Sequence, residues 1–116
     1  MIIKETLLDI IRNYLQVVNR AGIQAKQAIL FGSWARNEAG PDSDIDLVVL
    51  APEFDERHDR ELIGRLWSLR VETPDAWRIE PIACGEREWR EDTERLILEY
   101  ARREGEVIVF EPEIAS

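Results

Sequence analysis

The sequence predicts an α/β domain with one small mixed β-sheet and helices packed against it. Two short apolar runs, at residues 26–31 and 44–50, are bounded by turn residues in the manner of buried strands. Segments with helical spacing of apolar residues alternate with these runs, as in a sheet covered by helices. About a dozen residues connect the two runs, which is too long for a tight hairpin and marginal for a parallel crossover. We therefore expect strands of both directions in one sheet.

The size and charge of the chain narrow its class. Its 116 residues suggest a single domain over 1–116, and its composition, 45% hydrophobic and 34% charged, is that of a globular protein. The net charge of −9 leaves no general basic face, so duplex nucleic acid is not an expected partner. The single cysteine, Cys84, excludes an internal disulfide and a multi-cysteine zinc site. No apolar run nears the roughly 20 residues of a membrane span and no leader pattern is present, so we expect a cytoplasmic protein without a membrane partner.

Apolar periodicity predicts three helices. The first covers 3–20 and ends before Gly22, and the second runs from 56 to about 70 with Asp55 as its N-cap. The only histidine, His58, would lie on the surface of that second helix. The third is a long helix over 86–103 with Trp89, Leu96, Ile97 and Tyr100 pointing inward. Its solvated face would pair opposite charges at i and i+4, namely Glu86 with Arg90, Glu91 with Arg95 and Glu99 with Arg103.

Two further strands would complete the sheet. Residues 77–83 alternate, with Trp77, Ile79 and Pro81 on one face. Pro81 cannot donate a ladder hydrogen bond, which places this strand at an edge of the sheet or ends it there. The last short strand would cover 107–110.

Asp44 and Asp46 lie two residues apart at the head of the second strand, so their side chains point to the same face. Like charges this close repel each other, and a bound divalent cation would offset that repulsion. Mg²⁺ prefers hard oxygen ligands and commonly binds one or two carboxylates together with substrate phosphates. The alternative is a pair of solvated residues at a strand end.

Gly32 and Ser33 follow the first strand directly and have the chemistry of a phosphate cradle. Glycine admits a phosphate close to the backbone, serine adds a hydroxyl, and a helical turn over 33–38 would offer free N–H groups. Arg36 falls one turn after Ser33 and can reach the same anion. Without the carboxylates nearby, Gly32 and Ser33 would be interpreted as an ordinary turn, and Arg36 as a surface residue.

A third carboxylate would complete a two-metal site. Glu80, on the alternating strand, is the best candidate, and Asp75, in the preceding loop, is the alternative. Glu80 can also be interpreted as an exposed strand residue paired with Arg78.

The motif Gly32-Ser33-x-Ala-Arg, followed by Ser43-Asp44-Ile-Asp46-Leu and later by Arg-Ile-Glu80, resembles the minimal nucleotidyltransferases of the DNA polymerase beta-like superfamily. The resemblance covers nearly the whole chain and departs at Asn37, where the family often has glycine. It implies two Mg²⁺ ions bound by Asp44, Asp46 and Glu80. It also implies nucleotide phosphates held by Gly32 and Ser33, with Arg36 and Ser43 in the nucleotide-binding set.

The same resemblance implies a reaction and a partner. The reaction would move a nucleoside monophosphate, AMP from ATP, to a hydroxyl and release pyrophosphate. Many family members are encoded beside a HEPN-domain protein, and several act as antitoxins that adenylylate a tyrosine of that protein. The competing interpretation is a binding antitoxin or scaffold that kept the fold, lost turnover and neutralises its partner by complex formation. A glycosyltransferase, in which Asp-x-Asp also grips a metal and a nucleotide diphosphate, is disfavoured because the chain is short.

The four tryptophans are interpreted by position. Trp34 lies within the cradle and can cover the site, face a partner or pack on the sheet. Trp67, Trp77 and Trp89 are expected in the core or at an interface. In a domain with a small core they favour an exposed apolar patch, and therefore a homodimer or a partner surface.

Overall fold

The chain forms a four-stranded mixed sheet. The computed structural model describes residues 4–36, 38–40, 43–56 and 60–112, so that the expectations for Asn37 and His58 lie outside the described residues. The strand order is β3-β2-β1-β4, with β1 antiparallel to both β2 and β4, and β2 parallel to β3. The strands are β1 Gln27–Phe31, β2 Ile45–Leu50, β3 Ile79–Cys84 and β4 Glu106–Val109. The predicted mixed sheet is confirmed, and Pro81 lies on an edge strand as expected.

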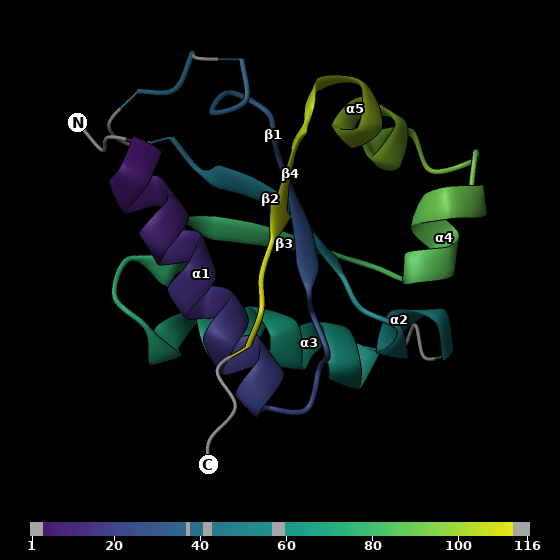
Figure 1. Cartoon of the computed structure of the whole chain (residues 1–116), viewed down its shortest axis with the longest axis horizontal. Coiled ribbons are helices and arrows are strands. Elements are labelled where there is room, and N and C mark those ends of the chain that lie inside the picture. The colour runs from purple at the N-terminus through teal and green to yellow at the C-terminus, as the bar shows by residue number, and fades with distance from the viewer. Residues whose placement is uncertain (1–3, 37, 41–42, 57–59, 113–116) are drawn as a thin grey trace.

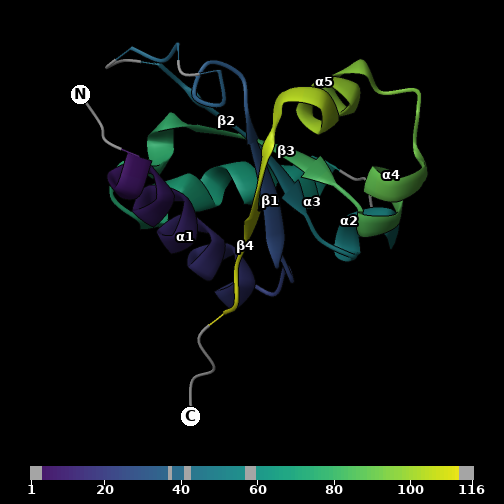
Figure 2. The ribbon, with the colours of Figure 1, turned by 45° about the horizontal axis from the view of Figure 1, so that its top comes forward.

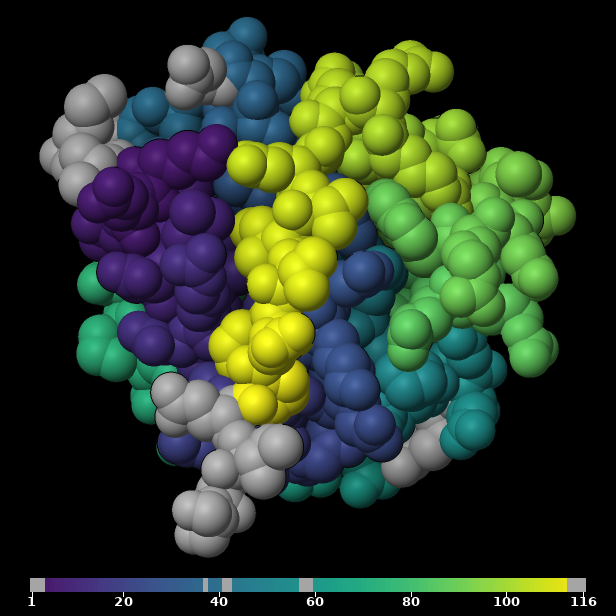
Figure 3. Space-filling view, in the orientation of Figure 1, coloured from purple at the N-terminus to yellow at the C-terminus, as the bar shows by residue number. Residues whose placement is uncertain are grey.

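Helices cover both faces of the sheet (Figures 1 and 2). Helices α1 (Lys4–Arg20) and α3 (Arg60–Ser68) pack on one face, and α4 (Glu86–Glu91) and α5 (Leu96–Glu104) lie on the other. Figure 3 shows α1 and β4 side by side on the surface that faces the viewer. No helix of the described chain is long and apolar enough to cross a membrane.

The side chains of β2 alternate between the two faces of the sheet, so this strand contributes to two separate cores, each covered by helices. Ile45, Leu47 and Val49 join the large core with α1, whereas Val48 and Leu50 join a smaller core with Leu98 and Ala101 of α5. The first helix is amphipathic as predicted, and it ends before Gly22, whose φ of 97° favours glycine. Its buried Tyr14 hydroxyl donates to the carbonyl of Leu66, which ties α1 to α3.

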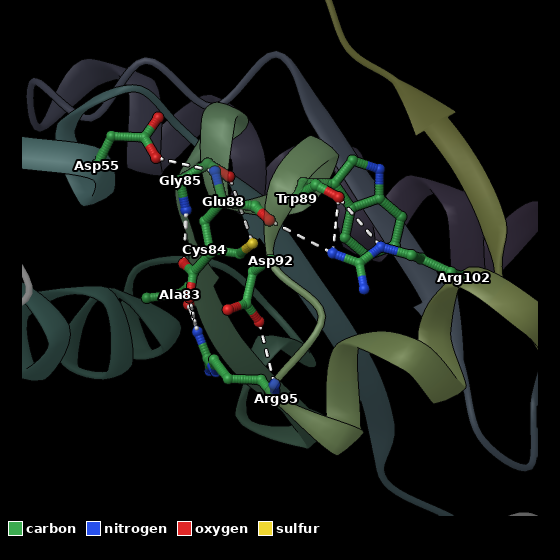
Figure 4. Close-up of polar contacts among 9 residues, drawn as sticks. All are labelled: Asp55, Ala83, Cys84, Gly85, Glu88, Trp89, Asp92, Arg95 and Arg102. Atoms are coloured by element: carbon green, nitrogen blue, oxygen red, sulfur yellow. Dashed lines mark hydrogen bonds and ion pairs between the residues drawn. The ribbon is translucent and has the colours of Figure 1, made fainter.

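The second predicted helix is wrong in its bounds and in its cap. The structure has α2 (Glu53–Glu56), then α3, then the 3₁₀ helix η1 (Leu69–Glu72). Asp55 lies inside α2, and its carboxylate accepts hydrogen bonds from two backbone N–H groups at the start of α4. One belongs to Arg87 (2.9 Å), and the other to Glu88 (3.0 Å; Figure 4). A carboxylate can satisfy the free N–H groups of any helix that packing brings within reach. Gly85 makes room for it, because an ideal Cβ there would lie 1.9 Å from Asp55 Oδ1.

We expect Asp55→Ala to lower the free energy of unfolding by about 1–2 kcal/mol, since two N–H groups of α4 lose their acceptor. Urea denaturation followed by circular dichroism measures the change. Glu56→Ala is the matched control, because Glu56 is exposed on the same short helix, and it should change stability by less than about 0.5 kcal/mol. Equal losses in the two variants would show that the cap contributes nothing.

The long helix predicted over 86–103 is broken into α4 and α5. Asp92 Oδ2 accepts the N–H of Arg95 (3.0 Å), and Arg95 Nη1 donates to Glu88 Oε2 (2.8 Å) and to the carbonyl of Ala83 (3.2 Å) (Figure 4). An aspartate that bonds nearby backbone competes with helix continuation. The break turns α5 so that Leu98 and Ala101 are buried, while the supposed inward residues Leu96, Ile97 and Tyr100 are exposed.

Two further expectations for this region are corrected. The ion pairs seen are Arg95 with Glu88 and Arg102 with Glu99, in place of the predicted i, i+4 pairs. Trp89 is half-buried and lies under Arg102, 4.8 Å from ring centroid to guanidinium carbon. Trp77 lies in the 3₁₀ helix η2 (Ala76–Arg78) and is 66% exposed, so it is neither a strand residue nor a core residue.

Cys84, the last residue of β3, is a buried structural thiol. Burial, with the neighbouring Glu88 carboxylate as the next cause, raises the pKa of Cys84 to about 12. Because the thiolate is the reactive form, we expect the folded protein to resist disulfide-exchange reagents near pH 8 and to react fully in denaturant. Rapid modification of the native protein would contradict this.

Candidate active site

The sheet brings two of the predicted carboxylates into direct register. In the parallel pairing of β2 and β3, Asp46 lies opposite Glu80. Asp46 is on the face of β2 that carries Val48 and Leu50 toward α5, at the end of the strand where the apolar series stops. Asp44 comes one residue before β2 and is exposed. Asp75 is exposed in a left-handed conformation (φ 64°) before η2, so the strand register brings Glu80, and not Asp75, to the pair.

The carboxylates perturb one another. The pKa of Asp46 is raised by burial first and by the charge of Asp44, against a lowering by a hydrogen bond with Glu80 and by the charge of Arg36. The pKa of Glu80 is raised by burial first, then by the negative charge of Asp44, with Asp46 adding to it. The negative charge of Asp44 therefore acts on both Asp46 and Glu80.

The donor set suits a hard divalent cation. All three groups are carboxylates, the oxygen ligands that Mg²⁺ prefers, and a cation would offset the repulsion between their negative charges. Within the described residues, however, no three His, Cys, Asp or Glu side chains already surround one metal position. Asp44, Asp46 and Glu80 would therefore have to turn toward a common point to hold a cation.

Gly32 lets the end of β1 pass beside Asp46. Its φ is +76°, and an ideal Cβ there would lie 2.2 Å from Asp46 Oδ2, so a side chain would collide with that carboxylate. The described residues 32–36 form a hydrogen-bonded turn and not a helix. The carbonyl of Gly32 accepts the N–H of Arg36 (3.1 Å), and that of Ser33 accepts the N–H of Glu38 (2.8 Å). The cradle and the carboxylates are thus immediate neighbours.

Arg36 does not lie free for an anion. Its Nε donates to Glu38 Oε2 (3.0 Å) and its Nη1 donates to Glu104 Oε2 (3.2 Å) at the end of α5. Trp34 is half-buried against the large core, so that packing on the sheet is the arrangement seen. In the described part of the chain, its buried Nε1 has no hydrogen-bond partner.

Ser43 and Arg78 hold the loop that leads to the carboxylates. Ser43 Oγ accepts the N–H of Gly40 (2.8 Å), and the Ser43 carbonyl accepts from Arg78 Nη2 (3.1 Å). Arg78 is buried, and the sequence suggested it only as an ion-pair partner of Glu80. The sequence placed it within the predicted strand over 77–83, whereas it ends η2 just before β3, and its role in anchoring the segment before Asp44 depends on the fold.

The glycine turn at the end of β1 thus adjoins Asp46 of β2, which lies opposite Glu80 of β3, and residues of these types are chemically suited to phosphate esters held with a divalent cation. The model of the nucleotidyltransferase domain family matches residues 11–109, and the chain therefore belongs to that family. The family predicted from the motifs is confirmed, and family membership supports nucleotidyl transfer as the general chemistry.

Two solved structures share the fold. A crystal structure of a toxin–antitoxin with AMP-PNP aligns with a TM-score of 0.58 at 18% identity, over 83% of this chain and 70% of that chain. A structure from Sulfolobus solfataricus, provisionally assigned as a nucleotidyltransferase, aligns with a TM-score of 0.52 at 19% identity, over 70% of this chain and 68% of that chain. No curated protein matches the chain.

Proposed function

We propose that the protein is a Mg²⁺-dependent nucleotidyltransferase that moves AMP from ATP to a tyrosine hydroxyl of a HEPN-domain partner, and that it acts as the antitoxin of the pair. The observation that carries this proposal is the register that sets Asp46 opposite Glu80 and beside Gly32. Family membership supports the transfer in general. The toxin–antitoxin structure with AMP-PNP, which shares the fold, supports an adenine nucleotide and a toxin as the partner, while the HEPN domain and the tyrosine come from the resemblance alone.

Each residue has a role in the proposed reaction. Gly32 and Ser33 would receive the phosphates that leave as pyrophosphate, while Asp44, Asp46 and Glu80 would hold the divalent cations. Bound cations lower the pKa of the acceptor hydroxyl and neutralise charge on the phosphates. Asp46 and Glu80 would orient the hydroxyl oxygen toward the α-phosphorus. The bond between that oxygen and phosphorus forms, the bond to pyrophosphate breaks, and the hydroxyl proton passes to water.

Intact-mass spectrometry of the partner tests the proposal. A HEPN-domain protein, sought among the products of the genes that flank this one, is incubated with this protein, ATP and Mg²⁺. We expect the partner to gain the mass of AMP on a tyrosine, and we expect EDTA or the double substitution Asp44→Asn/Asp46→Asn to prevent the gain. No mass gain with any nucleoside triphosphate, with Mg²⁺ or Mn²⁺, would refute it.

A second candidate is an antitoxin that neutralises its partner by binding alone. Two observations favour it: the carboxylates are not gathered around a metal position within the described residues, and Arg36 is held by two carboxylates. In that case Asp46→Asn would rescue cells that express the partner as well as the unaltered protein does. Loss of rescue with a retained complex would instead favour the enzyme.

A further inference from the structure

Arg36 is clamped between two carboxylates from different parts of the chain. Glu38 lies in its own loop, whereas Glu104 is the last residue of α5, 68 positions away. The end of α5 is fixed by packing, because an ideal Cβ at Gly105 would lie 2.3 Å from Ile29 Cγ2 on β1 and 2.3 Å from the carbonyl of Ala101. The fold itself therefore places Glu104 against Arg36.

The two contacts occupy both edges of the guanidinium. A guanidinium grips a phosphate or carboxylate with two parallel N–H donors, either Nε with Nη2 or Nη1 with Nη2. Glu38 takes Nε from the first edge, and Glu104 takes Nη1 from the second. A bidentate grip on a phosphate therefore requires Arg36 to leave at least one of these carboxylates.

The charges around Arg36 also oppose its contact with a phosphate. The three side chains together carry one net negative charge, and they lie at the C-terminal end of α5, where the helix dipole is also negative. The backbone N–H of Arg36 donates to the carbonyl of Gly32 (3.1 Å), and Gly32 adjoins Asp46, so the clamp lies beside the Gly32 turn and that carboxylate. A triphosphate that approaches Arg36 would therefore be repelled by this net negative charge as long as both ion pairs of Arg36 are intact.

We infer that Glu104, assisted by Glu38, is a positioning residue that holds Arg36 away from the nucleotide phosphates. Nucleotide binding then exchanges the two carboxylates for phosphate oxygens on the same guanidinium. This inference rests on the proposed nucleotide site. It adds that Glu38 and Glu104, which lie outside the Gly-Ser and Asp-x-Asp motifs, lower the affinity of this chain for nucleotide.

Calorimetric titration with AMP-PNP and Mg²⁺ tests the inference. We expect Glu104→Gln to bind about threefold more tightly, and Glu38→Gln/Glu104→Gln about tenfold, since each exposed ion pair holds Arg36 only weakly. In the transfer reaction the KM for ATP should fall while kcat is unchanged. Glu104→Asp, which keeps the charge, should remain near the unaltered protein. A purely structural role would lower the melting temperature and leave affinity unchanged.

Controls separate the clamp from general charge effects. Glu99→Gln removes a carboxylate of the same helix that pairs with Arg102 at 3.0 Å, and it should leave AMP-PNP affinity unchanged. In an Arg36→Ala background, Glu104→Gln should give a smaller gain than in the unaltered protein. If Glu104→Gln binds equally or more weakly while Asp46→Asn impairs nucleotide binding, the inference fails and the proposed function stands. If neither the unaltered protein nor any variant binds AMP-PNP, both fail.

Discussion

Asp46→Asn is expected to slow AMP transfer by about 10³-fold or more, while the fold is retained. Asp46 is the carboxylate that meets both halves of the site, because it lies opposite Glu80 in β3 and its Oδ2 adjoins Gly32. Asparagine has nearly the same shape but no charge, so it keeps the packing and loses the interaction with a cation. The rate of transfer to the partner at saturating ATP and Mg²⁺ measures the effect.

The same substitution should stabilise the protein in EDTA. The folded state raises the pKa of Asp46, so it binds a proton more readily than the unfolded state does. The free energy of unfolding of the unaltered protein therefore falls as pH rises from the ordinary carboxyl pKa through the folded pKa, and it stays lower above that range. Asp46→Asn lacks this loss. We expect a gain of at most about 1 kcal/mol near neutral pH, because the group is partly exposed and screened, and no gain at acidic pH.

Asp9→Asn is the matched control for both measurements. Asp9 is exposed on α1 and meets Arg12 at 4.0 Å on the surface. Its substitution should change neither the transfer rate nor the stability by a measurable amount. If Asp46→Asn still transfers the nucleotide at the normal rate, Asp46 is not part of the active site. If the variant loses transfer because it unfolds, Asp46 has only a structural role.

The parts of the fold that depend on residues close together in the sequence could be predicted from the sequence alone. Apolar runs with turn residues at their ends specified β1 and β2, although β2 begins at Ile45 and leaves Asp44 just outside the strand, so the shared face of Asp44 and Asp46 stays a prediction. The choice between Glu80 and Asp75 could not be made in this way. Only the parallel register of β2 with β3 brings Glu80 to Asp46, and register between distant strands is decided by the packing of both faces.

Three polar side chains were misassigned for one physical reason, which is that each bonds to a partner far away in the sequence. Asp55 bonds to α4, 32 positions away, and Arg78 bonds to Ser43, 35 positions away. Arg36 bonds to Glu104 at an even greater separation. A charged side chain takes whatever donor or acceptor tertiary packing presents, and spacing along the chain does not encode that choice.

Gly32→Ala is expected to lower kcat/KM for ATP by about 10²-fold, because a small displacement at a reacting centre is costly. The φ of +76° is unfavourable for alanine by about 1–2 kcal/mol. The added Cβ would lie 2.2 Å from Asp46 Oδ2, so the carboxylate would have to rotate away from the turn that begins at Gly32. Steady-state kinetics with the partner and thermal denaturation measure the two effects separately.

Gly22→Ala separates backbone strain from displacement of Asp46. Gly22 has a φ of +97°, and an ideal Cβ there has no atom within 4 Å. Its substitution should therefore cost about 1–2 kcal/mol of stability, as Gly32→Ala does, and leave transfer unchanged. If both variants lose similar stability but only Gly32→Ala loses activity, the close approach of β1 to Asp46 is required for the reaction. If Gly32→Ala retains full activity, the glycine serves only the turn, and the phosphate cradle must be sought elsewhere.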